Sequence, residues 1–192
     1  MLPGSPTFEF RAWAPSFPGL PSPENEERQE EIYLIPLGVS GHSIKLRGDA
    51  LEIKDLLKEQ DGLQLWDPAT RLPFPIPAAL VERELLVRLA LSEPLAREHY
   101  DAETLLKEVV EPRQRNIATV RVAKRRHLFM ATACRAETAQ VEVAGQRLMT
   151  AAAEHTDATA VRRAIAELGL DAHANMDYPT MLGRLLPLPM VT

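Results

Sequence analysis

The stretch "SIKLRGDALEIKDLL", residues 43–57, places a charged residue at every second position of two apolar runs. Gly48-Asp49 lies between the runs and has the composition of a two-residue hairpin loop with Gly first. With this loop, Lys45 pairs with Glu52, and the apolar residues of the two strands pair with one another. One face is then apolar, and the other carries Lys45, Arg47, Glu52 and Lys54. The fold depends on whether these charges meet open water or the inside of a closed sheet.

Alternating apolar and polar residues predict further strands on both sides of this hairpin. The predicted strands are "TFEFRAW" (7–13), "EIYLIPL" (31–37), "NIATVRVAKRRHLFMATA" (116–133), "CRAETAQVEV" (134–143) and "RLMTAAAEH" (147–155). Ala144-Gly145 is expected to turn between the last two, and Pro36 is expected to end the second strand or to restrict it to an edge. The acidic run 23–31 is expected to form a solvated loop or a short helix.

Helical patterns occupy the middle and the end of the chain. Amphipathic spacing predicts helices over 78–91, 101–110, 157–170 and 178–186. The proline-rich stretch 63–77 is expected to be an extended connection anchored by Trp66 and Phe74. The order of strands, helices, strands and helices favours an α+β fold with an antiparallel sheet, in a single domain over residues 1–192.

The mixed charges of the hairpin recur in other predicted strands. The further members are Glu9 and Arg11 in 7–13, Lys124 and Arg126 in 116–133, Glu137 in 134–143 and Glu154 in 147–155. If the sheet closes into a barrel, these side chains converge inside it, where cations can bind phosphate oxygens and carboxylates can hold a divalent metal. The alternative is a sheet with one face in water, which is common among antiparallel sheets. The repetition over several strands favours the barrel.

Composition narrows the class of protein. The net charge of −5 and the pI near 5.6 argue against a general nucleic-acid binder but leave room for a local basic pocket. Cys134 is the single cysteine, which excludes an internal disulfide and fits a reducing compartment. Residues 1–20 lack the pattern of a signal peptide, and no segment reaches the roughly 20 apolar residues of a membrane span. We therefore expect a cytoplasmic protein without membrane or nucleic-acid partners.

The end of the chain carries a family resemblance. Residues 137–186, "ETAQVEVAGQRLMTAAAEHTDATAVRRAIAELGLDAHANMDYPTMLGRLL", resemble the C-terminal part of CYTH domains, the triphosphate tunnel metalloenzymes that include class IV adenylyl cyclases and thiamine triphosphatases. In that pattern a late strand ending in Glu leads into a helix, an "LGL"-type stop and a "Y-P-x-x-L"-like segment. "KLR", "LEIK" and "AKRRHLF" resemble the basic strands of the family in the expected order. The resemblance implies a closed antiparallel β-barrel with helices packed outside.

The resemblance also implies roles for the charged residues. Members of the family bind a triphosphate through basic residues of the tunnel, and Mg²⁺ or Mn²⁺ through acidic ones. The candidates for the phosphate side are Arg11, Lys45, Arg47, Lys54, Lys124 and Arg126. The candidates for the metal side are Glu9, Glu52, Glu137 and Glu154, and two of these, Glu9 and Glu154, are the candidate catalytic residues.

The sequence departs from the family pattern mainly on the acidic side. Thr7 stands where the first strand of the family has an additional Glu, and Ala152 stands where the late pair of acids has one member. Two potential metal ligands are therefore absent, while the basic side is largely complete. Arg11 stands in place of a Lys, which replaces a compact charge by a planar fork.

Three functions stay open at this point. The first is metal-dependent hydrolysis of an inorganic or organic triphosphate bound in the basic tunnel. The second is a non-catalytic module that binds a nucleotide or polyphosphate in the same tunnel, which the missing carboxylates favour. The third is a protein-interaction domain that keeps only the fold. In the first two, the expected partner is a triphosphate-containing small molecule, and the sequence indicates neither which one nor an oligomeric state.

Overall fold

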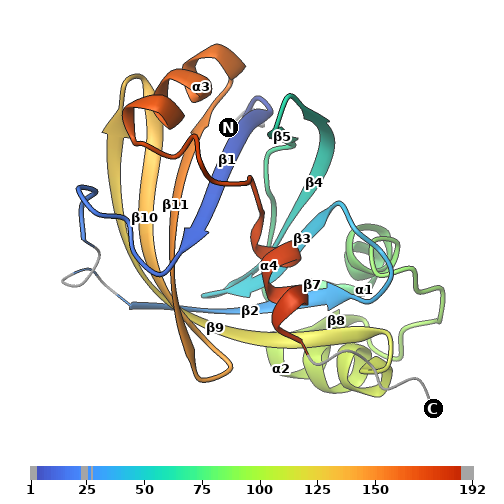
Figure 1. Cartoon of the computed structure of the whole chain (residues 1–192). Helices are drawn as coiled ribbons and strands as arrows, with labels where there is room; N and C mark the ends of the chain where they lie inside the picture. The colour runs from blue at the N-terminus through green and yellow to red at the C-terminus, as the bar shows by residue number, and fades with distance from the viewer. Residues whose placement is uncertain (1–3, 23–25, 27, 187–192) are drawn as a thin grey trace.

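The structure is a computed structural model that describes residues 4–22, 26 and 28–186. Its barrel strands are β1 (Thr7–Ala14), β2 (Arg28–Pro36), β3 (His42–Arg47), β4 (Ala50–Gln60), β5 (Leu63–Trp66), β9 (Ile117–Ala131), β10 (Cys134–Val143) and β11 (Gln146–His155). The order around the barrel is β3-β2-β9-β10-β11-β1-β5-β4, and β4 pairs with β3 to close it (Figure 1). Every neighbouring pair is antiparallel. The predicted closed antiparallel barrel is confirmed.

Shorter elements complete the fold. β6 (Thr70–Pro73) pairs with β4, and β7 (Ile76–Pro77) pairs with β8 (His99–Tyr100). The helical segments are α1 (Ala78–Leu80), η1 (Val81–Leu86), α2 (Ala102–Thr104), η2 (Leu105–Val110), η3 (Glu111–Arg113), α3 (Ala158–Glu167) and α4 (Tyr178–Leu185). The hydrogen bonding of η1 and η2 is π-helical, and η3 is a 3₁₀ turn. Within the described ranges, none of these helices has the length and apolar composition to cross a bilayer.

The β3–β4 hairpin has the register that its sequence predicts. Lys45 pairs with Glu52, and the flanking apolar residues pair as expected. Gly48 begins the turn with a φ of +59°, a conformation that a residue without a Cβ atom adopts at little cost. Because β4 continues past the hairpin to pair with β5, this hairpin closes the barrel.

The prediction for residues 63–77 is wrong. The structure has β5, β6 and β7 there instead of an extended connection. Asp61 and Gly62 both have positive φ, of 50° and 78°, so β4 turns directly back into β5 in a tight hairpin. β5 has four residues, too few to show a clear alternation next to the prolines that follow it.

Strand β2 begins earlier than predicted. Residues 28–30 are part of the strand rather than of a loop or short helix, and residues 23–25 and 27 of the acidic run lie outside the described residues. β2 lies between β3 and β9, not at an edge, and Pro36 is its last residue. The pairing with β9 extends from Arg28 to Pro36. The hydrogen bonds of this ladder therefore keep residues 28–30 in the strand, although their side chains are polar.

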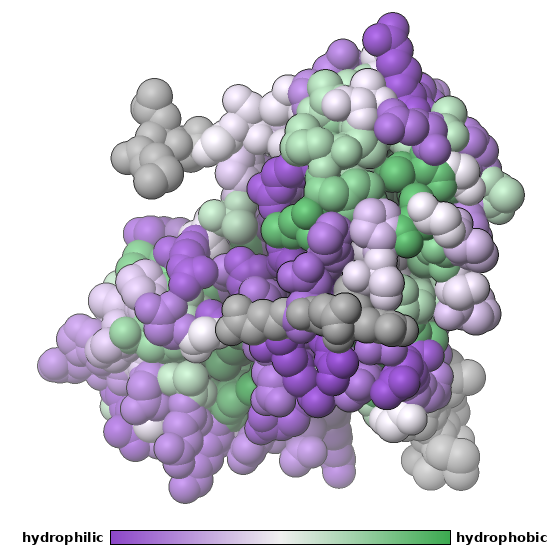
Figure 2. Space-filling model, turned by 90° about the vertical axis from the view of Figure 1, so that its left-hand side faces the viewer, coloured by the Kyte–Doolittle hydropathy of each residue, from purple (hydrophilic) through white to green (hydrophobic). Residues whose placement is uncertain are grey.

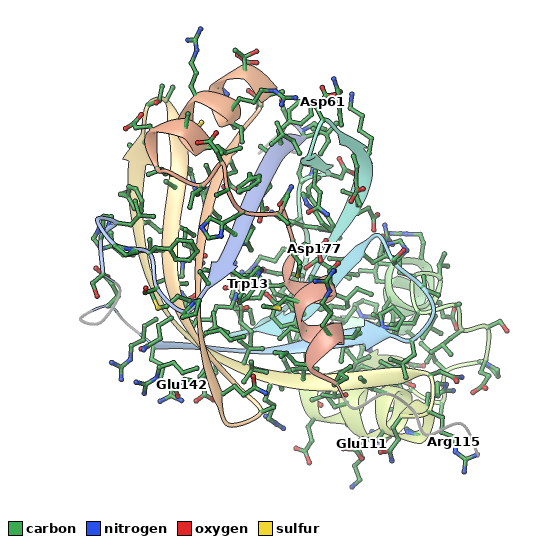
Figure 3. All side chains as sticks on the ribbon, in the orientation of Figure 1. Trp13, Asp61, Glu111, Arg115, Glu142 and Asp177 are labelled. Atoms are coloured by element: carbon green, nitrogen blue, oxygen red, sulfur yellow. The ribbon has the colours of Figure 1, made fainter. Side chains whose placement is uncertain are left out.

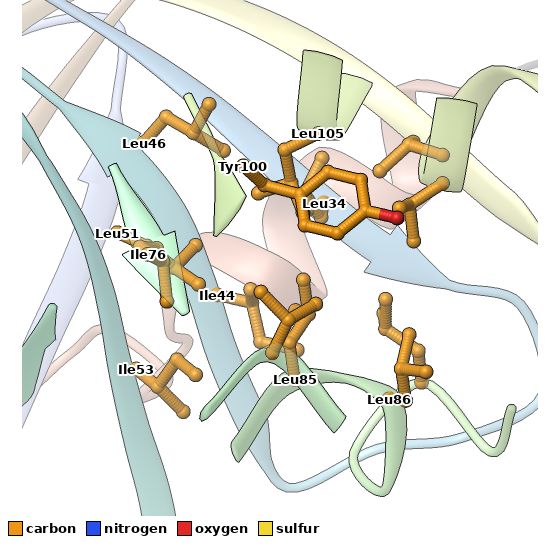
Figure 4. Packing of buried hydrophobic residues seen from close by; sticks show 14 of the residues in the cluster. Leu34, Ile44, Leu46, Leu51, Ile53, Ile76, Leu85, Leu86, Tyr100 and Leu105 are labelled. Atoms are coloured by element: carbon orange, nitrogen blue, oxygen red, sulfur yellow. The ribbon is translucent and has the colours of Figure 1, made fainter. Parts of the chain in front are cut away.

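Helical segments cover the outer, apolar face of one side of the barrel. Leu34, Ile44 and Leu51 project outward from three neighbouring strands and pack in one cluster with Leu85 of η1 and Leu105 of η2 (Figure 4). Each of these side chains is at most 1% exposed. Burial of a side chain of this size stabilises the fold by about 1.5–3 kcal/mol. The apolar positions of these strands are therefore fixed outward, and the alternating charged positions point inward.

Helix α3 covers a second part of the barrel's outside. Val161, Ala164 and Ile165 pack in one cluster with Phe10 of β1 and with alanines of β10 and β11. The side chain of Asp157 caps the helix by accepting a hydrogen bond from the backbone N–H of Thr159. The small alanine side chains let the helix approach the strands closely.

The interior of the barrel is partly apolar and partly charged. Val120 and Val122 of β9 pack with Tyr33 of β2 and Leu182 of α4 in one buried cluster. Further along the same face of β9, the inward positions carry charged side chains. Figure 2 shows one face of the molecule on which hydrophilic residues spread over the middle and lower part, with apolar residues grouped above them. The apolar cluster and α4 thus leave only part of the interior open.

Candidate anion site inside the barrel

A cavity of about 410 Å³ lies in the charged part of the barrel. Its basic lining residues are Arg11, Lys45, Arg47, Lys54, Arg71, Lys124, Arg126 and Arg135. Its acidic lining residues are Glu9, Glu52, Glu137, Glu154 and Asp177. Every residue that the sequence analysis named for the phosphate side or the metal side lines this one cavity. Basic residues outnumber acidic ones here, although the whole chain carries a net charge of −5.

At the centre of one basic group lies a carboxylate that the sequence analysis missed. Glu31 of β2 has no exposed side-chain surface and forms ion pairs with Lys45, Arg47 and Lys124. Its Oε1 atom lies 2.9 Å from Lys45 Nζ and 3.7 Å from Arg47 Nη1. Burial alone would raise the pKa of Glu31, but Lys124 and Lys45 hold it at about 2. A full negative charge therefore lies among Lys45, Arg47 and Lys124 at neutral pH.

Lys124 is enclosed more fully than its basic neighbours in this group. Its side chain is 4% exposed, and its Nζ donates a hydrogen bond of 3.1 Å to the hydroxyl of Tyr33. The Nζ also lies 3.9 Å from the centre of the Tyr178 ring, a cation–π contact. Burial and the nearby charge of Lys45 lower the pKa of Lys124 to about 7, although Glu31 opposes this effect. Lys124 therefore titrates near neutral pH.

A second charged group surrounds Arg11 of β1. Its Nε lies 3.0 Å from Glu9 Oε1, and its Nη1 lies 3.2 Å from Glu137 Oε1. Glu137 also pairs with Arg126, at 3.2 Å. Burial would lower the pKa of Arg11, but Glu9 and Glu137 together hold it above its ordinary value. These ion pairs join β1, β9 and β10 across the barrel interior.

Lys54 of β4 is the basic residue with the greatest freedom to bind an added anion. In the part of the chain that the structure describes, no carboxylate pairs with its ammonium group within 4.0 Å. Glu52, two residues away, is already held by Arg47 at 2.7 Å and by Arg71 at 2.8 Å. Lys54 therefore contributes positive charge that no carboxylate of residues 4–22, 26 and 28–186 neutralises at close range.

Comparison with known proteins gives matches among solved structures only. No protein-family model and no curated protein matches the sequence. A candidate adenylate cyclase from Bacillus halodurans matches with a TM-score of 0.53 and 11% identity, over 93% of this chain and 96% of that chain. A candidate adenylyl cyclase from Hippeastrum, described as having a dominant triphosphatase activity, matches with a TM-score of 0.51 and 12% identity, over 95% of this chain and 98% of that chain.

The shared architecture extends over the whole barrel, because both alignments cover more than nine-tenths of each chain. The chain has the triphosphate tunnel fold. The resemblance to CYTH domains is thereby confirmed for the fold, with the closed barrel, the outer helices and the charged interior all in place. We refer to the cavity described above as the tunnel.

The acidic residues of the tunnel do not form a ready-made metal site. The ion pairs of the four candidates are Glu9 with Arg11, Glu137 with Arg11 and Arg126, Glu52 with Arg47, Arg71 and Lys45, and Glu154 with Arg135. Among the described residues, no group of three or more Asp, Glu, His or Cys side chains is placed to hold a metal ion. Mg²⁺ prefers near-octahedral coordination by oxygen. A divalent ion would have to displace arginines or bring oxygen ligands with it.

Residues of the C-terminal part that the sequence analysis did not assign bind β1, the strand that carries Glu9 and Arg11. The side chain of Asn175 accepts a hydrogen bond of 2.8 Å from the backbone N–H of Arg11 and donates one of 3.1 Å to the carbonyl of Glu9. Trp13 donates from its ring N–H to the carbonyl of Met176, at 2.8 Å. These bonds fasten the segment before α4 to β1.

Helix α4 places an aromatic ring against the charged groups. Tyr178 stacks on Tyr33, with ring centres 5.6 Å apart, and packs edge-on against Trp13. Asp177, the N-cap residue of α4, accepts a hydrogen bond of 2.9 Å from Gln64 of β5. Figure 3 shows Trp13 and Asp177 beside α4 near the centre of the ribbon. The Tyr178 ring covers the ammonium group of Lys124 and so contributes to the burial that lowers the pKa of this residue.

Proposed function

We propose that the tunnel binds the triphosphate group of a small molecule. The observation that carries this proposal is the convergence of Lys45, Arg47 and Lys124 on one buried anion, Glu31. Side chains that hold carboxylate oxygens with charge-assisted hydrogen bonds also hold phosphate oxygens. Lys54 adds a charge that none of the described carboxylates neutralises at close range. The tunnel is therefore suited to a polyanion.

The spacing of the basic residues suits several linked phosphates better than one. Lys45 and Arg47 are two residues apart on β3, and Lys124 and Arg126 are two residues apart on β9. Positions i and i+2 of a strand lie about 6.5 Å apart, so each strand presents two successive cations along the tunnel. Lys54 on β4 extends the basic lining further. An extended phosphate chain can contact all of these residues, whereas a single phosphate cannot.

Binding is tested with tripolyphosphate, by calorimetry and by thermal stabilisation. Arg47→Gln is expected to weaken binding about tenfold or more, because it removes a charge that lines the tunnel. Arg125→Gln is the matched control, since it removes the same charge from a β9 position of opposite strand parity to Lys124, and it is expected to change binding less than about twofold. Equal losses in both variants, fading together at high salt, would show nonspecific attraction and overturn the proposal.

Hydrolysis of the bound triphosphate is the second candidate function. The observation that favours it is the position of Glu9 opposite Glu154 in the β1–β11 ladder, with Glu137 on the neighbouring strand β10. Mg²⁺ or Mn²⁺ arriving with the triphosphate would supply positive charge near the terminal phosphoryl group. The basic residues would meanwhile hold the phosphate chain in place.

Phosphate release in the presence of Mg²⁺ or Mn²⁺ separates hydrolysis from binding alone. If the chain is a triphosphatase, Glu154→Gln is expected to lose release while keeping tripolyphosphate affinity within about threefold, because the change keeps the shape of the side chain but removes its charge. A wild-type protein that binds tripolyphosphate but releases no phosphate with either metal would exclude hydrolysis. Fast release that Glu154→Gln leaves unchanged would show that Glu154 has no part in it.

A further inference from the structure

Glu31 binds the basic residues that the proposed function assigns to a phosphate group. It is the shared partner of Lys45, Arg47 and Lys124, and its side chain has no contact with solvent. Neighbouring strands place the four residues together, because Glu31 pairs with Arg47, and Tyr33, the next inward residue, pairs with Lys45. The ion pairs neutralise basic residues that would otherwise repel one another inside the barrel.

Resting on the proposed function, we propose that Glu31 is an internal counter-anion that holds these three basic residues in the empty tunnel and releases them to an incoming phosphate chain. A bound phosphate takes over the ion pairs with Lys45, Arg47 and Lys124, and Glu31 then lies beside it as a like charge. Glu31 therefore has two opposite effects on binding. It competes with the ligand for the same cations, and it keeps Lys124 charged before the ligand arrives.

Titratable groups from several elements surround Lys124. Lys45 of β3, Glu31 of β2 and Glu137 of β10 act on its pKa directly, and Tyr33 of β2 and Tyr178 of α4 cover it with their rings. Arg47 of β3 and Arg11 of β1 bind the same two carboxylates. Among the described residues, Glu31 is the only one of these groups that forms an ion pair with the ammonium group of Lys124. Loss of its charge lowers the pKa of Lys124 further below its value of about 7. Glu31 is thus a positioning residue that acts through Lys124.

The test is the affinity for tripolyphosphate between pH 5.5 and pH 8, measured by calorimetry on wild type and Glu31→Gln. At pH 5.5 the variant is expected to bind about tenfold more tightly or better, because the competing charge is gone. This advantage is expected to shrink at least about tenfold by pH 8, because Lys124 loses its proton at lower pH in the variant. A ratio of the two affinities that stays constant with pH, or weaker binding by the variant at every pH, would overturn the proposal.

Glu30→Gln is the matched control. It removes the same charge from the neighbouring residue of β2, which is exposed and lies outside the set of residues lining the tunnel. It is expected to follow wild type within about twofold at every pH. If Glu30→Gln and Glu31→Gln shift the pH profile alike, the effect is one of net charge and the proposal fails.

The outcomes for the two proposals are separable. If wild type binds tripolyphosphate but the ratio of the two affinities stays constant with pH, the counter-anion proposal fails while the proposed function stands, and if neither protein binds, both fail. If Glu31→Gln does not fold by circular dichroism, Glu31→Asp replaces it, since it withdraws the carboxylate by one methylene group. The NMR titration of the Lys124 side chain in ligand-free protein then gives the answer, with a lower pKa in the variant expected and an unchanged pKa overturning the proposal.

Discussion

At the scale of single residues, the charge of Glu31 links stability to pH. Its pKa is about 2 in the folded protein and about 4.5 when unperturbed, so folding favours the ionised form. The resulting stabilisation is fully present above the unperturbed pKa and is lost as the pH falls from about 4.5 to about 2. The shift corresponds to about 3 kcal/mol of unfolding free energy.

Urea unfolding of wild type and Glu31→Gln at pH 6 and at pH 2 measures this contribution. Wild type is expected to lose about 3 kcal/mol more unfolding free energy over this interval than the variant does. The comparison cancels the other carboxylates, which titrate in both proteins. Equal losses would mean that Glu31 is not ionised in the folded protein.

Strand parity predicted six of the eight basic lining residues, all but Arg71 and Arg135, but not the partners that they have. Lys45 and Arg47 alternate with apolar residues, and the structure places both in the tunnel. Glu31 escaped prediction because it ends the acidic run 23–31, and the part of β2 after it is apolar on both faces, with Leu34 under the helices outside and Tyr33 in the interior. Ion pairs between strands distant in sequence, such as that of Glu31 with Lys124, follow from the closed topology and not from spacing along one strand.

At the scale of elements, α4 is held to the barrel by Leu182, which has no exposed surface and packs with Tyr33 and Val122. Leu182→Ala is expected to reduce the unfolding free energy by about 2–5 kcal/mol, because it leaves a cavity in the apolar part of the interior. Chemical denaturation measures the change. Leu185→Ala, at a half-buried position of the same helix, is expected to cost clearly less. A small loss for Leu182→Ala would show that α4 packs loosely.

The turn between β10 and β11 is a place where the chain can be stabilised. Ala144 and Gly145 have φ of +48° and +75°, the left-handed conformation that a two-residue hairpin turn of type I′ requires. Ala144→Asn is expected to raise stability by up to about 1 kcal/mol, since Asn tolerates this conformation better than Ala. Thermal unfolding measures the gain. Ala133→Asn, in the turn before β10 and without a positive φ, should give none.

Some strands and turns could be predicted from their own sequence, and others could not. Hairpins with a glycine in the turn and long alternating strands, such as β3–β4 and β10–β11, were predicted with their turn residues. β5 was not predicted, because it has only four residues. Its place depends on pairing with β4 on one side and, on the other, with β1, which lies far from it in sequence. Contacts between distant segments also decide that β2 begins at Arg28 within a polar run.

At the scale of the whole molecule, the tunnel is a basic interior within an acidic protein. We expect Mg²⁺ or Mn²⁺ alone to change the melting temperature by less than about 1 °C, because each candidate carboxylate already pairs with an arginine. Tripolyphosphate at about 100 times its Kd should raise the melting temperature by roughly 5–10 °C. A thermal-shift series with each component alone and with both measures these effects. Stabilisation of several degrees by either metal alone would show a preformed metal site.

The barrel strands are joined by ladders of unequal length. The β2–β3 and β1–β5 ladders each have three residue pairs in the described barrel, fewer than any other ladder that closes it. They divide the barrel into a sheet of five strands, which carries Lys124 and Arg126, and a smaller sheet of β3, β4 and β5, which carries Lys45 and Lys54. A phosphate chain bound to both sheets would act as a cross-link between them. Amide hydrogen exchange at these two ladders should therefore slow on binding, while exchange in the long β9–β10 ladder stays as it was.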